Sequence, residues 1–287
     1  MNAPAMPTVA LTERIGAVTK TLRGMNRLAV AVSGGVDSMT LASLAHRVLA
    51  GEVSMFHATS PAVPTEATQR TRELAHREGW DLCVIDAREF ESADYMANPV
   101  NRCFYCKTSL YGAIRPHTSA QIVSGANLDD LGEYRPGLLA AKEHGVRHPW
   151  VEARVDKKTV RAIARHLGLA DLSELPASPC LSSRIETGIG IDPAMLACVH
   201  ETERLVSARL APKTVRCRVR AMGAVIELDE ACLIALNGVQ RDALANAVRE
   251  LFARSGFDYS VSFAVYRVGS AFLHPIKLEK SSATQQP

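Results

Sequence analysis

Two serines, two glycines and an aspartate separate an apolar run from a helix-forming segment in the stretch SGGVDS, residues 33–38. The preceding residues, 28–32, carry no polar side chain, which is typical of a strand buried on both faces of a parallel sheet. The stretch therefore predicts a strand-to-helix turn whose backbone N–H groups bind phosphate. Its glycines let an anion approach the backbone, its hydroxyls add donors, and its carboxylate suits magnesium. The residues predicted to bind nucleotide here are Ser33, Gly34, Gly35, Asp37 and Ser38.

Three of the seven cysteines lie in settings that could do chemistry. Cys103 and Cys106 have CxxC spacing, which suits half a zinc site, a redox pair or part of an iron–sulfur site. Cys180 lies four residues before Arg184, whose charge could lower the pKa of the thiol. A zinc site needs a second pair nearby, whereas three thiolates can hold three irons of a cubic cluster and leave the fourth open. The other cysteines are expected to be small core residues: Cys83, Cys198, Cys217 and Cys232.

A third set of polar residues lies in the stretch VRCRVRAMG. Arg216, Arg218 and Arg220 are two residues apart, which in a strand places all three on one face. Cations on one face suit a substrate with a phosphate and carboxylates, and the alternative is the solvated outer face of a sheet. Glu227, on the next predicted strand, is expected to pair with one of them or to contact substrate. His57, after an earlier strand, could border an adenine, but an exposed histidine is the favoured interpretation.

These residues must be positioned by alternating strands and helices. Strands are expected at 28–32, 52–58, 82–85 and 121–123, and helices at 11–24, 39–49, 65–78 and 157–168. This alternation predicts a parallel sheet with helices on both faces, in which ligands bind at the carboxyl ends of the strands. The stretch SGANLDD follows the fourth strand, so Gly125 and Asn127 are expected to join the nucleotide site.

The pattern changes after a turn-rich stretch at 172–193. Helices are expected at 194–209 and 239–254, and strands near 215–220, 224–228 and 259–266, which together predict a small α+β domain. The expected organisation is therefore a nucleotide-binding α/β domain at 1–175, a cysteine-bearing linker at 176–192, a small α+β substrate-binding domain at 193–280 and a disordered tail at 281–287.

Composition narrows the class of protein. The 287 residues include 47% hydrophobic residues, enough for a full core, and the net charge is +3 with no dense basic run. A nucleic-acid partner is therefore not expected, because such proteins show a stronger basic footprint. No long apolar run and no signal core are present, so a cytoplasmic protein without a membrane partner is expected. In that reducing compartment the cysteines are expected to be metal-binding, catalytic or simply reduced.

The phosphate loop and the cysteine blocks together resemble a known family. The loop lacks GxxxxGK[ST] and GxGxxG, and SGGVDS is similar to the PP-loop of ATP pyrophosphatases, the adenine nucleotide alpha hydrolase-like fold. Further blocks occur in one order and resemble the LarE-type ATP-dependent sulfur transferases: NRCFYCK, YRPG at 134–137, CLSSRI at 180–185 and RVRAMG at 218–223. One departure is SGAN at 124–127, where related enzymes often carry a Gly-Thr-Asn turn.

The resemblance implies an activity and roles for residues. ATP would be cleaved to AMP and pyrophosphate, and the carboxylates of pyridinium-3,5-biscarboxylic acid mononucleotide would become thiocarboxylates in nickel-pincer cofactor synthesis. It implies ATP and Mg²⁺ as cofactors, a small pyridinium nucleotide as substrate and pathway enzymes as partners. A homo-oligomer is also expected. Catalytic roles are expected for Cys180, Asp37 and Arg184, and substrate contacts for Arg218, Arg220 and Glu227, with Arg216 undecided.

Two sources of sulfur are known in the family. In one form the cysteine matching Cys180 gives up its own sulfur and becomes dehydroalanine. In the other, three cysteines bind a [4Fe-4S] cluster whose open iron carries a sulfide. The CxxC pair favours the cluster form here, with Cys103, Cys106 and Cys180 as the ligands.

Three other functions could use some of the same sequence features. A tRNA 2-thiolation enzyme would need a basic surface for RNA. An amide-forming ligase of the NAD or GMP synthetase type would leave the three cysteines unexplained. A non-catalytic AMP-binding protein with a structural zinc would hold no iron and no sulfide.

Overall fold

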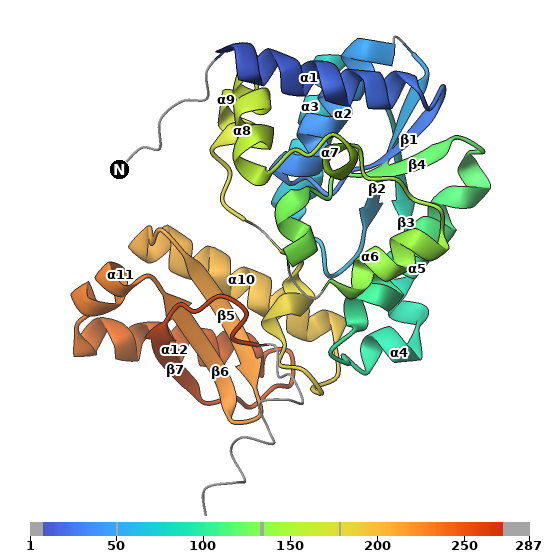
Figure 1. Ribbon diagram of the computed structural model, residues 1–287. Coiled ribbons are helices and arrows are strands. Elements are labelled where there is room, and N and C mark those ends of the chain that lie inside the picture. The colour runs from blue at the N-terminus through green and yellow to red at the C-terminus, as the bar shows by residue number, and fades with distance from the viewer. Residues whose placement is uncertain (1–7, 50, 133–134, 178, 272–287) are drawn as a thin grey trace, which may run out of the picture. The chain divides into compact units, whose positions relative to one another are not determined.

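The computed structural model describes residues 8–49, 51–132, 135–177 and 179–271 (Figure 1). The chain forms two compact units. The first contains the described residues up to Glu89 and those from Cys103 to Ala177, and the second contains Phe90–Arg102 and the described residues from Pro179 onward. The expected tail at 281–287 and Tyr134 of the YRPG block lie outside the described residues.

The first unit is built on a four-stranded parallel sheet with the order β3-β2-β1-β4 (Figure 1). Its strands are β1 (Leu28–Ala31), β2 (Val53–Thr59), β3 (Asp81–Asp86) and β4 (Gln121–Ser124). The chain runs from β1 outward to β2 and β3, and then returns to place β4 on the other side of β1. By the general rule for such sheets, ligands bind in the crevice outside the carboxyl ends of the strands at the point where the strand order reverses, which here is between β1 and β4.

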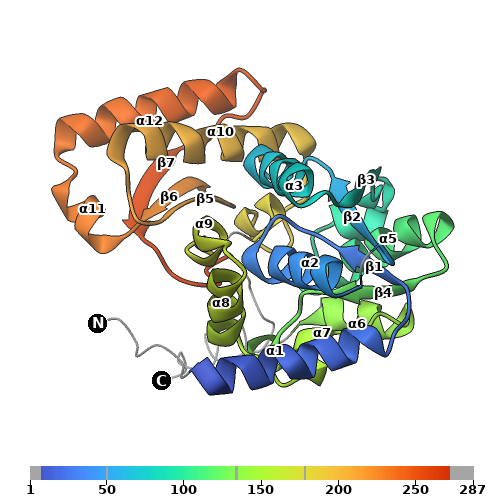
Figure 2. The same cartoon turned by 90° about the horizontal axis from the view of Figure 1, so that it is seen from above.

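Helices cover both faces of this sheet, as expected. In β1, Leu28 and Val30 belong to one core cluster, whereas Ala29 and Ala31 belong to the other. The first cluster includes side chains of α1, α2, α3 and α8, and the second includes side chains of α5 and α6. Figure 2 shows α1 and α8 packed beside α2. The helices of this unit are α1 (Thr8–Arg23), α2 (Val36–Leu49), α3 (Thr65–Glu78), α5 (Arg102–Ile114), α6 (Pro136–Glu143), α7 (Pro149–Glu152), α8 (Lys157–His166) and α9 (Ala170–Ser173).

The second unit is a small α+β structure with a three-stranded sheet of order β5-β6-β7. β5 and β6 form an antiparallel hairpin, and β7 pairs with β6 in parallel. Its elements are α4 (Ala93–Met96), the 3₁₀ turn η4 (Leu181–Arg184), α10 (Pro193–Leu210), β5 (Val215–Arg220), β6 (Gly223–Leu228), α11 (Glu230–Ala235), α12 (Gly238–Ala253) and β7 (Val261–Val265). The predicted fold class, a parallel-sheet α/β domain followed by a small α+β domain, is confirmed.

One segment differs from the expected domain boundaries. Phe90–Arg102 was expected in the first domain, but it packs within the second unit. The reason is a set of hydrogen bonds from buried Asn98, whose Nδ2 donates to the carbonyl oxygens of Glu186 at 2.9 Å and Ile189 at 2.8 Å. These partners lie about ninety residues further along the chain, so no local pattern could indicate them.

Candidate functional site

The SGGVDS stretch forms the predicted turn between β1 and α2. Its two serines close the turn, because Ser33 N donates to Ser38 Oγ at 3.0 Å and the two hydroxyl oxygens lie 3.1 Å apart. Ser38 Oγ in turn donates to the carbonyl oxygen of Gly35 at 3.2 Å. Ser33 is exposed, so its hydroxyl is accessible to a ligand, whereas Ser38 is buried and its hydroxyl holds the shape of the loop.

The phosphate loop after β1 and the loop that follows β4 both depend on glycine. Gly34 has a φ of +78°, and a Cβ there would lie 2.6 Å from the carbonyl oxygen of Ala67 in α3. A Cβ on Gly125, after β4, would lie 2.6 Å from the backbone nitrogen of Ser38. The structure therefore brings the two predicted nucleotide loops into direct contact, and only residues without side chains permit that approach.

Asp37 is the charged centre of this crevice. Asn127 Nδ2 donates to Asp37 Oδ1 at 3.2 Å, and the ammonium of Lys157 pairs with Oδ2. Trp150 Nε1 donates to the main-chain carbonyl of Asp37 at 3.1 Å. The Asp37 carboxylate is half-buried, so it can hold a cation while one side stays open to solvent.

Lys157 is the site residue that sequence reasoning missed. The helix that carries it was predicted, and Asp156 caps that helix by accepting from Thr159 N at 2.7 Å. In the sequence Lys157 is followed by Lys158, and nothing local distinguishes the two.

His57 corrects a prediction. It was expected to be exposed, but it is fully buried, with Nδ1 2.9 Å from the carbonyl oxygen of Val32 and Nε2 2.9 Å from Thr68 Oγ1. α3 covers this face of β2, which is why the ring lies inside. Burial lowers the pKa of His57 below its ordinary value.

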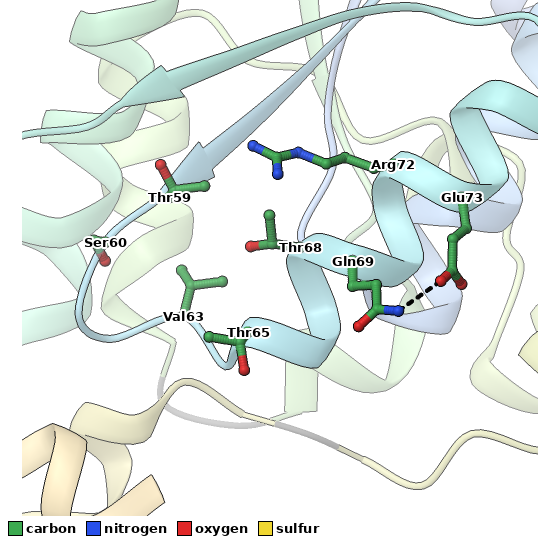
Figure 3. Close-up of a pocket in the computed structure, with 8 residues that line it drawn as sticks. All are labelled: Thr59, Ser60, Val63, Thr65, Thr68, Gln69, Arg72 and Glu73. Carbon is green, nitrogen blue, oxygen red and sulfur yellow. Dashed lines mark hydrogen bonds between the residues drawn. The ribbon is translucent and has the colours of Figure 1, made fainter.

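A pocket of about 520 Å³ opens at the carboxyl end of β2, beside the first half of α3 (Figure 3). Half of its eight lining residues carry a hydroxyl, and the others include one guanidinium and one carboxylate. In Figure 3 the Arg72 side chain extends toward Thr59, and Gln69 bonds to Glu73. The lining residues are Thr59, Ser60, Val63, Thr65, Thr68, Gln69, Arg72 and Glu73.

The CxxC pair lies at the start of α5. Cys103 and Cys106 are half-buried and three residues apart in a helix, so their thiols project from one face. The described part of the YRPG block packs against this turn, because a Cβ on Gly137 would lie 3.1 Å from Lys107 Cγ and 3.5 Å from the carbonyl oxygen of Cys103. The two motifs therefore form one structural block in the first unit.

Cys180 is exposed and directly precedes η4 in the second unit. Arg184, at the end of this turn, is 2% exposed and pairs with Glu203 of α10 at 2.9 Å. The guanidinium also donates to the carbonyl oxygens of Pro179 at 2.7 Å and Cys180 at 3.1 Å. Arg184 thus fixes the main chain on both sides of the thiol, with its charge balanced by Glu203.

β5 carries the arginine face as predicted, but that face is not solvated. Arg218 is 4% exposed and pairs with buried Glu227 at 3.0 Å, so the solvated-face alternative is wrong for this residue. Arg220 is partly exposed and lies between Glu227, at 3.1 Å, and Glu186, at 3.3 Å. Glu227 therefore pairs with two of the arginines. Arg216 lies over the ring of Tyr266, 5.8 Å from its centroid.

The arginine strand and the cysteine loop are joined in this unit. Arg218 Nη1 donates to the carbonyl oxygen of Ser183 at 2.9 Å, and a β-bridge links Ile185 to Val219. On the other side of the loop, Tyr95 Oη lies 2.6 Å from Ser182 Oγ. The position of Cys180 is thus set by neighbours from β5, α10 and the 90–102 segment.

Comparison with known proteins places this chain in a family. The asparagine synthase family model matches residues 15–103, which include the phosphate loop. A pyridinium-3,5-bisthiocarboxylic acid mononucleotide synthase of Lactiplantibacillus plantarum is 32% identical over 73% of this chain and 77% of its own length. The chain belongs to the LarE-type family of PP-loop proteins. Two uncharacterized proteins are also similar: one of Synechocystis, 37% identical over 71% of this chain and 77% of its own length, and one of Methanocaldococcus jannaschii, 26% identical over 71% and 78%.

Membership of the LarE-type family implies an ATP-using enzyme with Mg²⁺. In the described ranges no group of three or more histidine, cysteine, aspartate or glutamate side chains is arranged to hold a metal ion. All seven cysteines are described and none forms a disulfide. Within these same ranges no helix has the length and apolar character needed to span a bilayer.

Proposed function

We propose that this LarE-type protein is an ATP-dependent sulfur transferase that converts carboxylates of pyridinium-3,5-biscarboxylic acid mononucleotide to thiocarboxylates. The observation that carries the proposal is the crevice between β1 and β4, where a glycine-lined phosphate loop meets Asp37, Asn127 and Lys157. The family relation to a synthase of the bisthiocarboxylic nucleotide supports the choice of substrate.

The reaction balances in two steps. A substrate carboxylate oxygen attacks the α-phosphorus of ATP, and pyrophosphate leaves. A sulfur nucleophile then attacks the activated carbonyl carbon, and AMP leaves with the carboxylate oxygen. Adenylation is needed because oxide is a poor leaving group, whereas AMP is a good one, so the second step requires little beyond positioning.

Residues of the first unit would hold the nucleotide. Backbone N–H groups of Gly34, Gly35 and Ser38 and the exposed hydroxyl of Ser33 would bind phosphate oxygens, while the buried Ser38 hydroxyl shapes the loop and Gly125 leaves space for the backbone of Ser38. Asp37, oriented by Asn127, binds Mg²⁺ on the phosphates. Lys157 balances this carboxylate in the structure, and with magnesium bound its ammonium would be free to pair with a phosphate oxygen.

Residues of the second unit would hold the substrate. Arg220 is the partly exposed member of the arginine pair, so it is the one proposed to contact a phosphate or carboxylate directly. Arg218 and Glu227 are buried against each other, and their proposed contribution to substrate binding is to orient Arg220 and the backbone of Ser183. Arg184 would keep the Cys180 loop in place during reaction.

The proposed sulfur source is a cluster-bound sulfide. The described residues hold no ready-made group of three metal ligands, so Cys103, Cys106 and Cys180 are proposed to come together only when a [4Fe-4S] cluster binds, since thiolates are the ligands that such clusters take. When bound, such a cluster with one open iron would supply a sulfide nucleophile. In the alternative form, the exposed Cys180 gives up its own sulfur, and its peptide becomes lighter by one hydrogen sulfide after reaction.

The proposal also covers the partners, the oligomeric state and the location of the protein. The substrate is a small nucleotide, with enzymes of the nickel-pincer pathway as partners and a homo-oligomer as the working state. A cytoplasmic location suits seven cysteines without a disulfide.

Asp37→Ala tests the nucleotide chemistry. Pyrophosphate release in the presence of the biscarboxylated nucleotide is expected to fall about hundredfold or more, because placing a metal charge on the phosphates is worth several kcal/mol. The matched control is Asp171→Ala in α9, where an exposed carboxylate lies outside the crevice and full activity is expected. Release by Asp37→Ala at the rate of the control, with both proteins folded by circular dichroism, would refute the assignment.

A further inference from the structure

α3 supports the phosphate loop from behind. The helix backbone is so close to the loop that a Cβ on Gly34 would overlap the carbonyl oxygen of Ala67. Two side chains on the same side of the loop, Arg70 of α3 and His57 of β2, each bond to one of its carbonyl oxygens. Neither side chain belongs to the set that binds ATP or substrate in the proposed function.

Arg70 holds the middle of the loop. Its Nη1 donates to the carbonyl oxygen of Gly34 at 2.7 Å, and the side chain is half-buried. A peptide unit is planar and trans, so its C=O and the following N–H point in opposite directions. With the Gly34 carbonyl directed at Arg70, the N–H of Gly35 points away from α3, and it lies 3.4 Å from Ser33 Oγ.

His57 holds the start of the loop in the same way. The carbonyl oxygen of Val32 can only accept, so Nδ1 of His57 carries the proton and Nε2 accepts from the Thr68 hydroxyl. The same peptide unit contains the N–H of Ser33, which points away from His57 and donates to Ser38 Oγ. The neutral ring thus fixes the peptide that leads into the loop.

We propose that Arg70 and His57 are positioning residues that turn two carbonyl oxygens of the loop away from the bound phosphates. A carbonyl oxygen facing a phosphate would repel it, and a loop with two adjacent glycines can flip its peptides at little cost. Holding both peptides before ATP arrives removes an ordering cost from binding. The inference rests on the proposed use of this loop for ATP, and it is independent of the sulfur chemistry.

The test measures binding of ATP with magnesium and, separately, of adenosine, which has no phosphate. Arg70→Met is expected to weaken ATP binding about tenfold or more while adenosine binding stays at the wild-type value, because only the phosphates meet the loop. The matched control is Arg77→Met, which removes the same charge from an exposed position in the last turn of α3 and is expected to bind both ligands normally.

A pair of His57 variants tests the second contact. Asn can place an amide donor where Nδ1 stands, so His57→Asn is expected to keep ATP affinity within about threefold of wild type, whereas His57→Leu is expected to lose about tenfold. Melting curves report whether each variant folds. If His57→Leu does not fold, the comparison of Arg70→Met with Arg77→Met decides the proposal.

The outcomes separate this inference from the proposed function. A wild-type chain that binds no ATP would overturn the nucleotide site and the inference with it. A wild type that binds ATP alongside an Arg70→Met variant with unchanged ATP affinity would overturn the inference alone. Equal weakening of ATP and adenosine in Arg70→Met would also overturn it, because that result indicates general damage and not a role toward the phosphates.

Discussion

At the scale of single residues, the side chains that determine this site are charged groups whose partners are fixed by the fold. Asp37 could be singled out from its motif, because a carboxylate in a glycine-rich turn after a buried strand is the kind of group that binds magnesium beside phosphates. Lys157 could not, because its role depends on an ion pair across 120 positions of sequence. Arg218 was predicted as a cation on a strand face, but its burial against Glu227 depends on packing that no two-residue spacing reveals.

Glu227 gives a prediction about stability. The Glu227–Arg218 side chains are 3% and 5% exposed, so Glu227→Ala leaves a buried guanidinium without its carboxylate and is expected to lower the free energy of unfolding by about 3–5 kcal/mol. Glu250→Ala is the control, because its pair with Arg254 is highly exposed and is worth at most about 1 kcal/mol. Urea unfolding followed by circular dichroism measures both, and equal losses would contradict the buried pairing.

His57 gives a prediction about pH. Burial lowers its pKa in the folded chain below the ordinary 6.5, and the nearby charge of Arg72 acts in the same direction. As pH falls below that ordinary value the unfolded chain takes up the proton first, so the free energy of unfolding decreases with falling pH. Burial lowers the pKa of His148 too, which adds to the slope.

The variant His57→Gln isolates this contribution. Urea unfolding at about pH 7.5 and about pH 5.5 is expected to show a smaller loss of stability on acidification in the variant than in wild type. If the free energy of unfolding falls by the same amount between the two pH values in His57→Gln and in wild type, His57 does not titrate differently in the folded and unfolded chain.

At the scale of elements, the order of strands explains why distant motifs meet. The alternation of apolar runs and amphipathic helices predicted the parallel sheet, and the carboxyl-end rule predicted that residues after β1 and β4 share a site. Those expectations needed only the local pattern of apolar and polar residues along the sequence. The close support of the loop by α3 could not be predicted, because helix periodicity does not reveal which backbone atom lies against Gly34.

Gly34→Ala tests this support. A methyl group there combines a positive φ with overlap of Ala67, so the loss of stability is expected to be about 1–2 kcal/mol from the backbone and about 1–3 kcal/mol more from the overlap. Gly79→Ala is the matched control, since Gly79 has a φ of +69° and open space around its Cβ position. Equal losses of stability in the two variants, measured by thermal unfolding, would show that α3 moves to accommodate the added methyl group.

At the scale of the whole molecule, the residues proposed to act in the reaction are divided between two units. The first carries the proposed nucleotide site and the CxxC pair, and the second carries the arginine strand and Cys180. The change of pattern after residue 172 predicted this division. The placement of 90–102 with the second unit was missed, because Asn98 and Tyr95 find their partners only in the folded chain.

In the proposed function, ATP activates a substrate carboxylate as an adenylate before sulfur enters. The most direct measurement supplies the biscarboxylated nucleotide with heavy oxygen in its carboxylates, together with ATP, magnesium, sulfide and a stoichiometric amount of the protein. Mass spectrometry is expected to find one AMP for each thiocarboxylate formed, with the heavy oxygen carried by AMP. ADP in place of AMP, or thiocarboxylate formed with unlabelled AMP, would contradict the account.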